Sequence, residues 1–121
     1  MRPSKIRAKM RAGEKAVGFG ITFPCESLFD IAGYVGFDYA HLDSEHGVFD
    51  FVDVENMCRS ADLHGTTCTA RIPNIDSDTI LRFFDRGVMG ILAPHVSTRD
   101  EAEQVARASR YGPIGERSFG T

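Results

Sequence analysis

Segments with strand character alternate with segments of helical character from Ala16 to the end of the chain, and this alternation limits the possible folds more than any other feature of the sequence. Strands are predicted over residues 17–23, 37–43, 66–72 and 88–94, and a stretch with apolar residues at helical spacing follows each one. Their spacing of roughly 22 to 28 residues is typical of strand–helix–strand units. Such units build a parallel sheet, whose strands we expect to be buried on both faces. The sequence therefore predicts the α/β fold class.

Start and stop signals support the predicted helices. Gly36 and Gly87 are placed to end two of them, and Thr98 to Glu101 has the spacing of a capping box that begins the last. Ahead of the first strand, the basic residues 1–16 predict a short solvated helix that ends at Gly13. In the helix after the first strand, the apolar stripe predicted to face the sheet consists of Leu28, Ile31, Ala32 and Val35.

Two architectures suit this pattern: an open doubly wound sheet, or an arc of a (β/α)₈ barrel of the TIM type. The chain holds four β-α units, which is half of an eightfold barrel that normally needs about 250 residues. It also stops in a Gly-rich loop with no closing element. We therefore expect residues 1–121 to form the N-terminal half of a single barrel domain, with the sequence truncated after Thr121.

Composition narrows the functional class. The net charge of −3 gives no reason to expect binding to nucleic acid or to a membrane. The odd set of Cys25, Cys58 and Cys68 lacks C-x-x-C spacing, so neither a disulfide framework nor a zinc site is indicated. No apolar run has the length of a transmembrane helix or a signal peptide. A cytoplasmic location is the resulting expectation.

Polar residues gather where the predicted strands end, which is where α/β sheets and barrels bind ligands. The second strand runs into the loop DSEHG, residues 43–47, and the third ends at Arg71. His46 is a candidate base because imidazole changes charge near neutral pH, and Asp43 or Glu45 could tune it. Arg71 offers a planar, permanently charged fork suited to a carboxylate or an oxyanion. Since the two strands are neighbours, His46 and Arg71 could converge on one ligand.

Structural roles compete with these functional ones. DSEHG could be an ordinary polar turn, and Arg71 could simply pair with an acid. Glu45 could be a metal ligand, a helix-entry acid or a salt-bridge partner, and spacing does not choose among them.

The other histidines have simpler interpretations. We predict His41 to be a packed core residue, His64 to be solvated or stabilised by a helix dipole, and His95 to line a pocket. No dinucleotide fingerprint and no G-x-S-x-G nucleophile elbow is present.

Taken together, these segments resemble the HpcH/HpaI family of metal-dependent class II pyruvate aldolases. The resemblance runs from about residue 13 to the end of the chain and covers only the first half of a family member. It is carried by GFDYAHLDSEHG (36–47), ARIPN (70–74), FFDRG (83–87), ILAPHVSTRDEAEQVARASRY (91–111) and GERSFG (115–120).

The resemblance implies a lyase with a (β/α)₈ barrel that splits 4-hydroxy-2-oxo acids into pyruvate and an aldehyde. By the same resemblance, His46 is the catalytic base that moves the proton of the C4 hydroxyl, and Arg71 holds the oxo acid and stabilises the enolate. Asp85 matches an aspartate that raises the basicity of the histidine, and Asp43 and Glu45 match supporting acids. Because Asp85 ends a helix on the opposite side of its own barrel, it could reach a histidine only across a subunit interface. A homo-oligomer is therefore expected.

The resemblance also implies a divalent cofactor, Mg²⁺, Mn²⁺ or Co²⁺. The family's metal ligands, a Glu and an Asp, lie beyond Thr121, so no metal ligand is expected in this chain, and the 121 residues alone are expected to be inactive. Two alternatives remain open: an acyl-CoA carbon–carbon lyase of the citrate or malyl-CoA type, and a non-catalytic half-barrel that self-associates through its strand edges.

Overall fold

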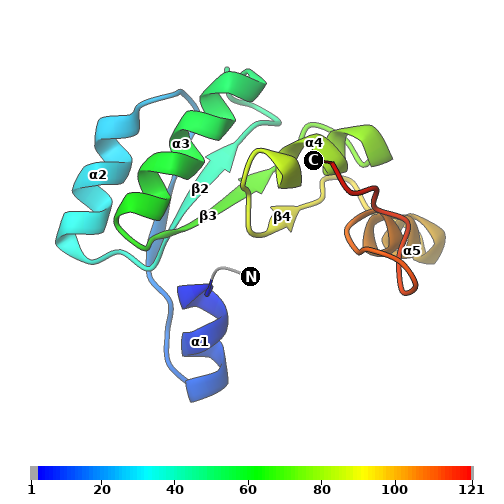
Figure 1. The fold of residues 1–121 in the computed structure, drawn as a ribbon, viewed down its shortest axis with the longest axis horizontal. Coiled ribbons are helices and arrows are strands. Elements are labelled where there is room, and N and C mark those ends of the chain that lie inside the picture. The colour runs from blue at the N-terminus through cyan, green and yellow to red at the C-terminus, as the bar shows by residue number, and fades with distance from the viewer. Residues whose placement is uncertain (1–2, 121) are drawn as a thin grey trace.

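The computed structural model describes residues 3–120, and the predicted alternation of strands and helices is confirmed. Four parallel strands lie in the order β1-β2-β3-β4 (Figure 1). Helix α1 precedes the sheet, α2 to α4 connect successive strands, and α5 follows the last strand. The strands are β1 (Gly18–Ile21), β2 (Tyr39–Asp43), β3 (Thr67–Arg71) and β4 (Ile91–Leu92). The helices are α1 (Lys5–Ala12), α2 (Glu26–Val35), α3 (Phe51–Leu63), α4 (Ser77–Asp85) and α5 (Arg99–Ala108).

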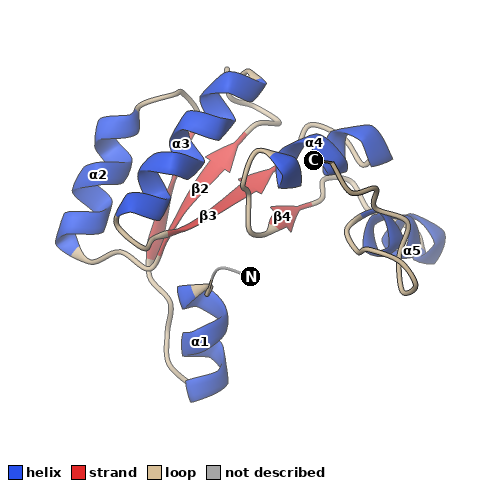
Figure 2. Cartoon of the chain, viewed as in Figure 1, coloured by secondary structure: helices blue, strands red, loops and turns tan. Residues whose placement is uncertain are grey.

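The connecting helices all pack on the same face of the sheet (Figure 2). Side chains alternate along β2, where Ala40 and Leu42 are fully buried under the helices. In β3, Cys68 and Ala70 are buried under the helices in the same way, although Thr67 on the other face is also buried. Phe29 of α2 joins the core under the helices. The hydrophobic core therefore lies between one face of the sheet and the helices.

The prediction that the strands are buried on both faces is wrong for the described residues. Tyr39, His41 and Asp43 point away from the connecting helices and are only half-buried, because none of those helices covers that face. A doubly wound sheet carries helices on both faces and reverses its strand order, and the sheet formed by residues 3–120 does neither. The fold is an arc of a parallel barrel.

The outer strands are shorter than predicted. The fourth strand was expected over residues 88–94 but pairs regularly with β3 only at Ile91 and Leu92. Single bonds extend the pairing, since the amide of Met89 donates to Cys68 at 2.9 Å. As an edge strand, β4 has one described neighbour, so fewer ladder hydrogen bonds fix its ends.

Helix α1 has the predicted ends but is more than a solvated helix. Ser4 caps its start and Gly13, in the left-handed conformation, ends it. The backbone amide of Lys5 donates to Thr67 Oγ1 at 2.9 Å, and Lys9 Nζ lies 2.8 Å from a carboxylate oxygen of buried Asp38. The helix therefore closes the end of the sheet where the strands begin. No helix within residues 3–120 is long and apolar enough to cross a bilayer.

Helix α2 forms as predicted, and Ala32 and Leu28 of its predicted stripe pack on the core, but the other half of that stripe does not. Ile31 and Val35 were expected to face the core, yet they are 56% and 67% exposed, while Phe29 and Ala32 are buried. The contact with α3 explains this orientation. His64 at the end of α3 sits against Gly33 and its Nε2 lies 3.1 Å from Asp30 Oδ1, which also accepts from Ser60 at 2.6 Å. His64 therefore takes part in a helix–helix contact and is not solvated as one expectation had it, while its position at the C-terminal end of α3 leaves the other, stabilisation by the helix dipole, as a prediction.

Replacing Gly33 with alanine is expected to lower the free energy of unfolding by about 1–3 kcal/mol, because the new Cβ would overlap the Cβ and Cγ of His64. This cost exceeds the helix-propensity gain of about 1 kcal/mol that alanine brings. Urea unfolding measures the difference. Gly20→Ala is the matched control, since its Cβ would meet nothing closer than 3.7 Å. Equal unfolding free energies of Gly33→Ala and Gly20→Ala would show that α2 and α3 can shift at little cost to accommodate the new Cβ.

Candidate functional site

The ends of β2 and β3 form the centre of the candidate site. Asp43 and Arg71 are register partners in the parallel ladder, so both side chains leave the same end of the sheet on the same face. The Nε atom of Arg71 donates to Asp43 Oδ1 at 2.8 Å, and Nη2 contacts Asp43 Oδ2. The same Nε lies 3.3 Å from Glu45 Oε2. Arg71 is therefore held between two carboxylates.

This contact fixes the charge of both partners. Hydrogen bonds from Arg71 lower the pKa of Asp43 from its ordinary 3.8 to about 2, with a further contribution from the amide of His46. The bond to Asp43 raises the pKa of Arg71. Both groups are therefore ionised at any pH near neutrality.

The lowered pKa of Asp43 predicts a specific loss of stability in acid. A carboxyl whose folded pKa is depressed stabilises the fold above its unfolded pKa, and this stabilisation disappears as the pH falls through the folded value. The unfolding free energy of the wild type should therefore decline more between pH 4 and about pH 2 than that of Asp43→Asn. Urea unfolding across this range tests the difference. If the unfolding free energies of the two proteins fell in parallel with pH, the contact of Asp43 with Arg71 would contribute nothing to stability.

The loop after β2 turns tightly and places His46 at the edge of the site. The amide of Gly47 donates to the carbonyl of Asp43 at 2.8 Å, and the amide of His46 donates to Asp43 Oδ1 at 3.3 Å. A Cβ at residue 47 would overlap the carbonyl oxygens of Asp43 and Thr22, so the turn needs glycine. The His46 side chain is 66% exposed, and its Nε2 lies 3.7 Å from Glu45 Oε2. His46 therefore faces solvent and a carboxylate together.

His95 completes the cluster from the segment after β4. Its backbone has φ 53°, and its Nε2 lies 2.7 Å from Glu45 Oε1. From its sequence position, His95 was expected only to line a pocket. The signal for a closer role was its place at the end of the fourth strand, because all parallel strands end on the same side of the sheet.

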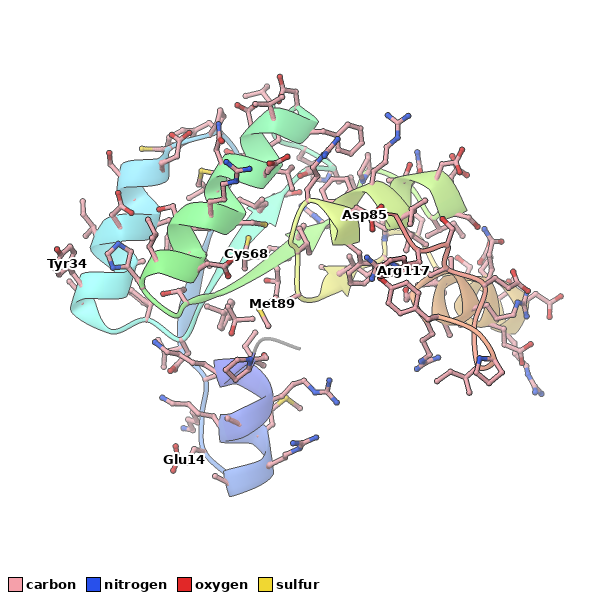
Figure 3. All side chains as sticks on the ribbon, in the orientation of Figure 1. Glu14, Tyr34, Cys68, Asp85, Met89 and Arg117 are labelled. Carbon is pink, nitrogen blue, oxygen red and sulfur yellow. The ribbon has the colours of Figure 1, made fainter. Side chains whose placement is uncertain are left out.

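The structure thus brings Asp43, Glu45, His46 and Arg71 together, and it leaves Asp85 apart. Asp85 ends α4 at the opposite end of the sheet, where its Oδ1 accepts from Arg117 Nη2 at 2.8 Å (Figure 3). Two cavities, of about 330 and 1050 Å³, also lie at that end, between α1 and the segments around Met89 and Tyr111. The candidate site is an open surface in the described part of the chain.

His41 lies one layer below the cluster on the uncovered face of β2. It is half-buried, and its Nδ1 lies 2.9 Å from Thr69 Oγ1 of β3. Burial lowers the pKa of this imidazole, which favours the neutral ring. His41 therefore resembles the predicted core histidine, although one side of it stays open.

The described residues do not form a metal site by themselves. No group of three or more His, Cys, Asp or Glu side chains with metal-binding geometry occurs within residues 3–120. The carboxylates of the cluster are already engaged, Asp43 by Arg71 and Glu45 by Arg71 and His95. A cation would have to displace these partners.

The arrangement suits an anionic ligand and proton transfer. A guanidinium has donors on three nitrogens, and the two acids engage Nε and Nη2 of Arg71, which leaves Nη1 without a partner among the described residues. Such a fork can hold a carboxylate or stabilise an oxyanion. His46, exposed beside it, can accept or return a proton.

Known proteins share this sequence and this fold. The chain is 32% identical over 117 residues to the hydroxypyruvate/pyruvate aldolase of Rhizorhabdus wittichii, covering 97% of the chain and 47% of that protein. It is 30% identical over 119 residues to the 4-hydroxy-2-oxovalerate aldolase of Novosphingobium aromaticivorans, covering 97% of the chain and 45% of that protein. The crystal structure of an HpcH/HpaI aldolase from Desulfitobacterium hafniense superimposes with a TM-score of 0.90 at 27% identity, covering 96% of the chain and 45% of that structure.

The chain spans about half the length of these relatives. Their barrel family accounts for the one-sided sheet, since an arc of a barrel carries its helices on the outside only. The sequence profile of the HpcH/HpaI aldolase/citrate lyase family matches residues 24–120. The chain belongs to the HpcH/HpaI aldolase/citrate lyase family.

Proposed function

We propose that residues 1–121 form the first half of a (β/α)₈ pyruvate aldolase that cleaves a 4-hydroxy-2-oxo acid to pyruvate and an aldehyde. The observation that carries this proposal is Arg71, held between Asp43 and Glu45 at the mouth of the sheet with His46 beside it. Its family setting supports the reaction, because the relatives named above are pyruvate aldolases.

In the proposed reaction, His46 accepts the proton of the C4 hydroxyl. The C3–C4 bond then breaks, C4 becomes the aldehyde carbonyl, and the electron pair moves through C3 to the C2 oxygen as an enolate. The guanidinium of Arg71 holds the oxo acid and stabilises this charge, which is the largest source of rate in many such reactions. A proton delivered to C3 completes pyruvate.

Asp43 and Glu45 support these groups. Two carboxylates around one guanidinium hold its plane in a fixed orientation. Little conformational entropy of the Arg71 side chain is therefore lost when the ligand binds. Glu45 Oε2 also lies 3.7 Å from His46 Nε2, so this carboxylate can help to orient the imidazole ring.

A divalent metal, Mg²⁺, Mn²⁺ or Co²⁺, would supply further positive charge to the enolate, and its Glu and Asp ligands would come from residues outside this chain. The proposed role of Asp85 needs a homo-oligomer. Asp85 lies at the far end of its own sheet, bonded to Arg117, so it would act on the His46 of a neighbouring subunit.

The family description favours a second candidate, cleavage of a citrate-type acyl-CoA. CoA carries several phosphates, which proteins bind with clusters of cationic side chains. At the strand ends of the described residues, the one guanidinium is that of Arg71, and the two neighbouring acids leave only its Nη1 without a partner, so it could not hold several phosphates. The oxo acid, with a single carboxylate to hold, suits this mouth better. A self-associating half-barrel without activity is the remaining alternative, and light scattering of the chain alone would reveal it.

The test uses a completed domain, in which residues 1–121 are followed by the part of the Novosphingobium aromaticivorans aldolase that lies beyond its matched region. We expect this protein, once shown to fold by a cooperative melt, to release pyruvate from 4-hydroxy-2-oxovalerate in the presence of Mn²⁺. Release of pyruvate is followed through lactate dehydrogenase. A folded completed domain that binds Mn²⁺ and releases no pyruvate would contradict the proposal, and cleavage of citryl-CoA instead would favour the second candidate.

A further inference from the structure

We infer that His95 is a positioning residue of the candidate site: it holds one oxygen of Glu45 so that the other oxygen supports Arg71 and faces His46. This inference rests on the proposed function for its catalytic meaning. Its structural content, a link from the segment after β4 through Glu45 to Arg71, stands on the contacts alone.

Glu45 is the centre of the link. Its side chain is only 12% exposed, and both of its oxygens have partners. Oε1 lies 2.7 Å from His95 Nε2, while Oε2 lies 3.3 Å from Arg71 Nε and 3.7 Å from His46 Nε2. The contact with His95 is the shortest of these, so it sets the rotation of the carboxylate. The longer contacts to Arg71 and His46 follow from that rotation.

The backbone of His95 is shaped for this contact. Among the described residues, His95 is the one non-glycine with a positive φ, 53°, a conformation that L-residues adopt rarely and that is often found at functional sites. Buried Pro94 fixes the chain just before it. The left-handed turn brings the otherwise 85% exposed imidazole back over the loop that follows β2, fifty positions earlier in the sequence.

The link joins the segments after three successive strands. Asp43 ends β2 and Glu45 follows it, Arg71 ends β3, and His95 follows β4. Asp43 secures one side of the guanidinium through a bidentate contact, and Glu45 secures it through a single weaker one. Loss of His95 should therefore loosen the Glu45 side first. In the reaction proposed above, His46 would lose the fixed carboxylate it faces.

The test follows the Nε–H group of Arg71 and the ring nitrogens of His46 by ¹⁵N NMR in the 121-residue chain. In His95→Ala we expect the Arg71 Nε–H to shift and to exchange with water about five- to tenfold faster, the effect of losing one hydrogen bond in the network. The His46 ring signals should move as well. His95→Gln keeps an N–H donor and should restore most of the wild-type spectrum. Val96→Ala, the matched control in the same segment, should leave both groups unchanged.

Unchanged Arg71 and His46 signals in folded His95→Ala would overturn the inference. If that variant does not fold, Glu45→Gln tests the same link from the other side, and an unmoved His95 ring signal would overturn it. Because no step requires catalysis, the result is independent of the proposed function. An inactive completed domain would contradict the proposed aldolase function and leave the His95–Glu45 link untouched. Unchanged spectra in His95→Ala would contradict the link and leave the proposed function untouched.

Discussion

Replacing His46 with asparagine is expected to lower the turnover of the completed domain by a factor of about 10²–10⁴, the usual contribution of a general base. Asparagine keeps the size and polarity of the side chain but cannot accept the C4 hydroxyl proton. The KM should change little, because His46 is not placed to bind the carboxylate end of the substrate, which we assign to Arg71. Steady-state kinetics with pyruvate detection measures both parameters.

The matched control is the same substitution at His64, a second histidine of the chain. His64 contacts Asp30 between α2 and α3 and lies outside the strand ends, so His64→Asn should reduce stability rather than turnover per folded molecule. Wild-type turnover in folded His46→Asn would remove His46 from the mechanism. An equal loss in both variants would indicate that the effect on His46 is structural.

Replacing Arg71 with leucine is expected to lower kcat/KM by about 10²–10³, the cost of removing one group that stabilises an oxyanion. Two effects combine here. The enolate loses its positive partner, and the neighbouring acids Asp43 and Glu45 lose the guanidinium that neutralises them. The uncompensated carboxylates would then repel an anionic substrate, so KM should rise while kcat falls.

Arg71→Lys separates geometry from charge. Lysine restores one positive charge but not the planar fork that contacts both oxygens of Asp43, so only part of the activity should return. A lysine variant with full activity would mean that charge alone suffices. A leucine variant with full activity would show that the oxo acid is held elsewhere.

Local patterns predicted the buried half of the fold well. The helix predicted after the second strand, α3, buries Val54, Met57 and Ala61, which recur at helical spacing, because it packs against β3 along its apolar face. The exposure of Ile31 and Val35 could not be predicted in the same way. The face that α2 buries is set by its neighbours, above all by the fit of Gly33 against His64 of the next helix, and such a contact leaves no periodic signal.

The sequence predicted which residues form the candidate site, but it did not predict which of them contact one another. Strand ends indicated that residues 43–46 and Arg71 would lie close together, since neighbouring parallel strands end at the same edge. The choice among possible roles for Glu45 was open, because one loop allows several orientations. In the structure, one oxygen of Glu45 contacts His95, fifty positions later in the sequence, and the other contacts Arg71, twenty-six positions later. Both contacts depend on the register of three strands.

We propose that this chain carries the proton-handling and anion-holding side of an aldolase site, and that the metal-holding side would come from residues outside it. Calorimetric titration of Mn²⁺ into the 121-residue chain and into the completed domain tests this directly. We expect saturable binding to the completed domain and none to the chain alone, because Asp43 and Glu45 are already engaged by Arg71 and His95. Saturable binding to the chain alone, abolished by Glu45→Gln, would contradict the claim.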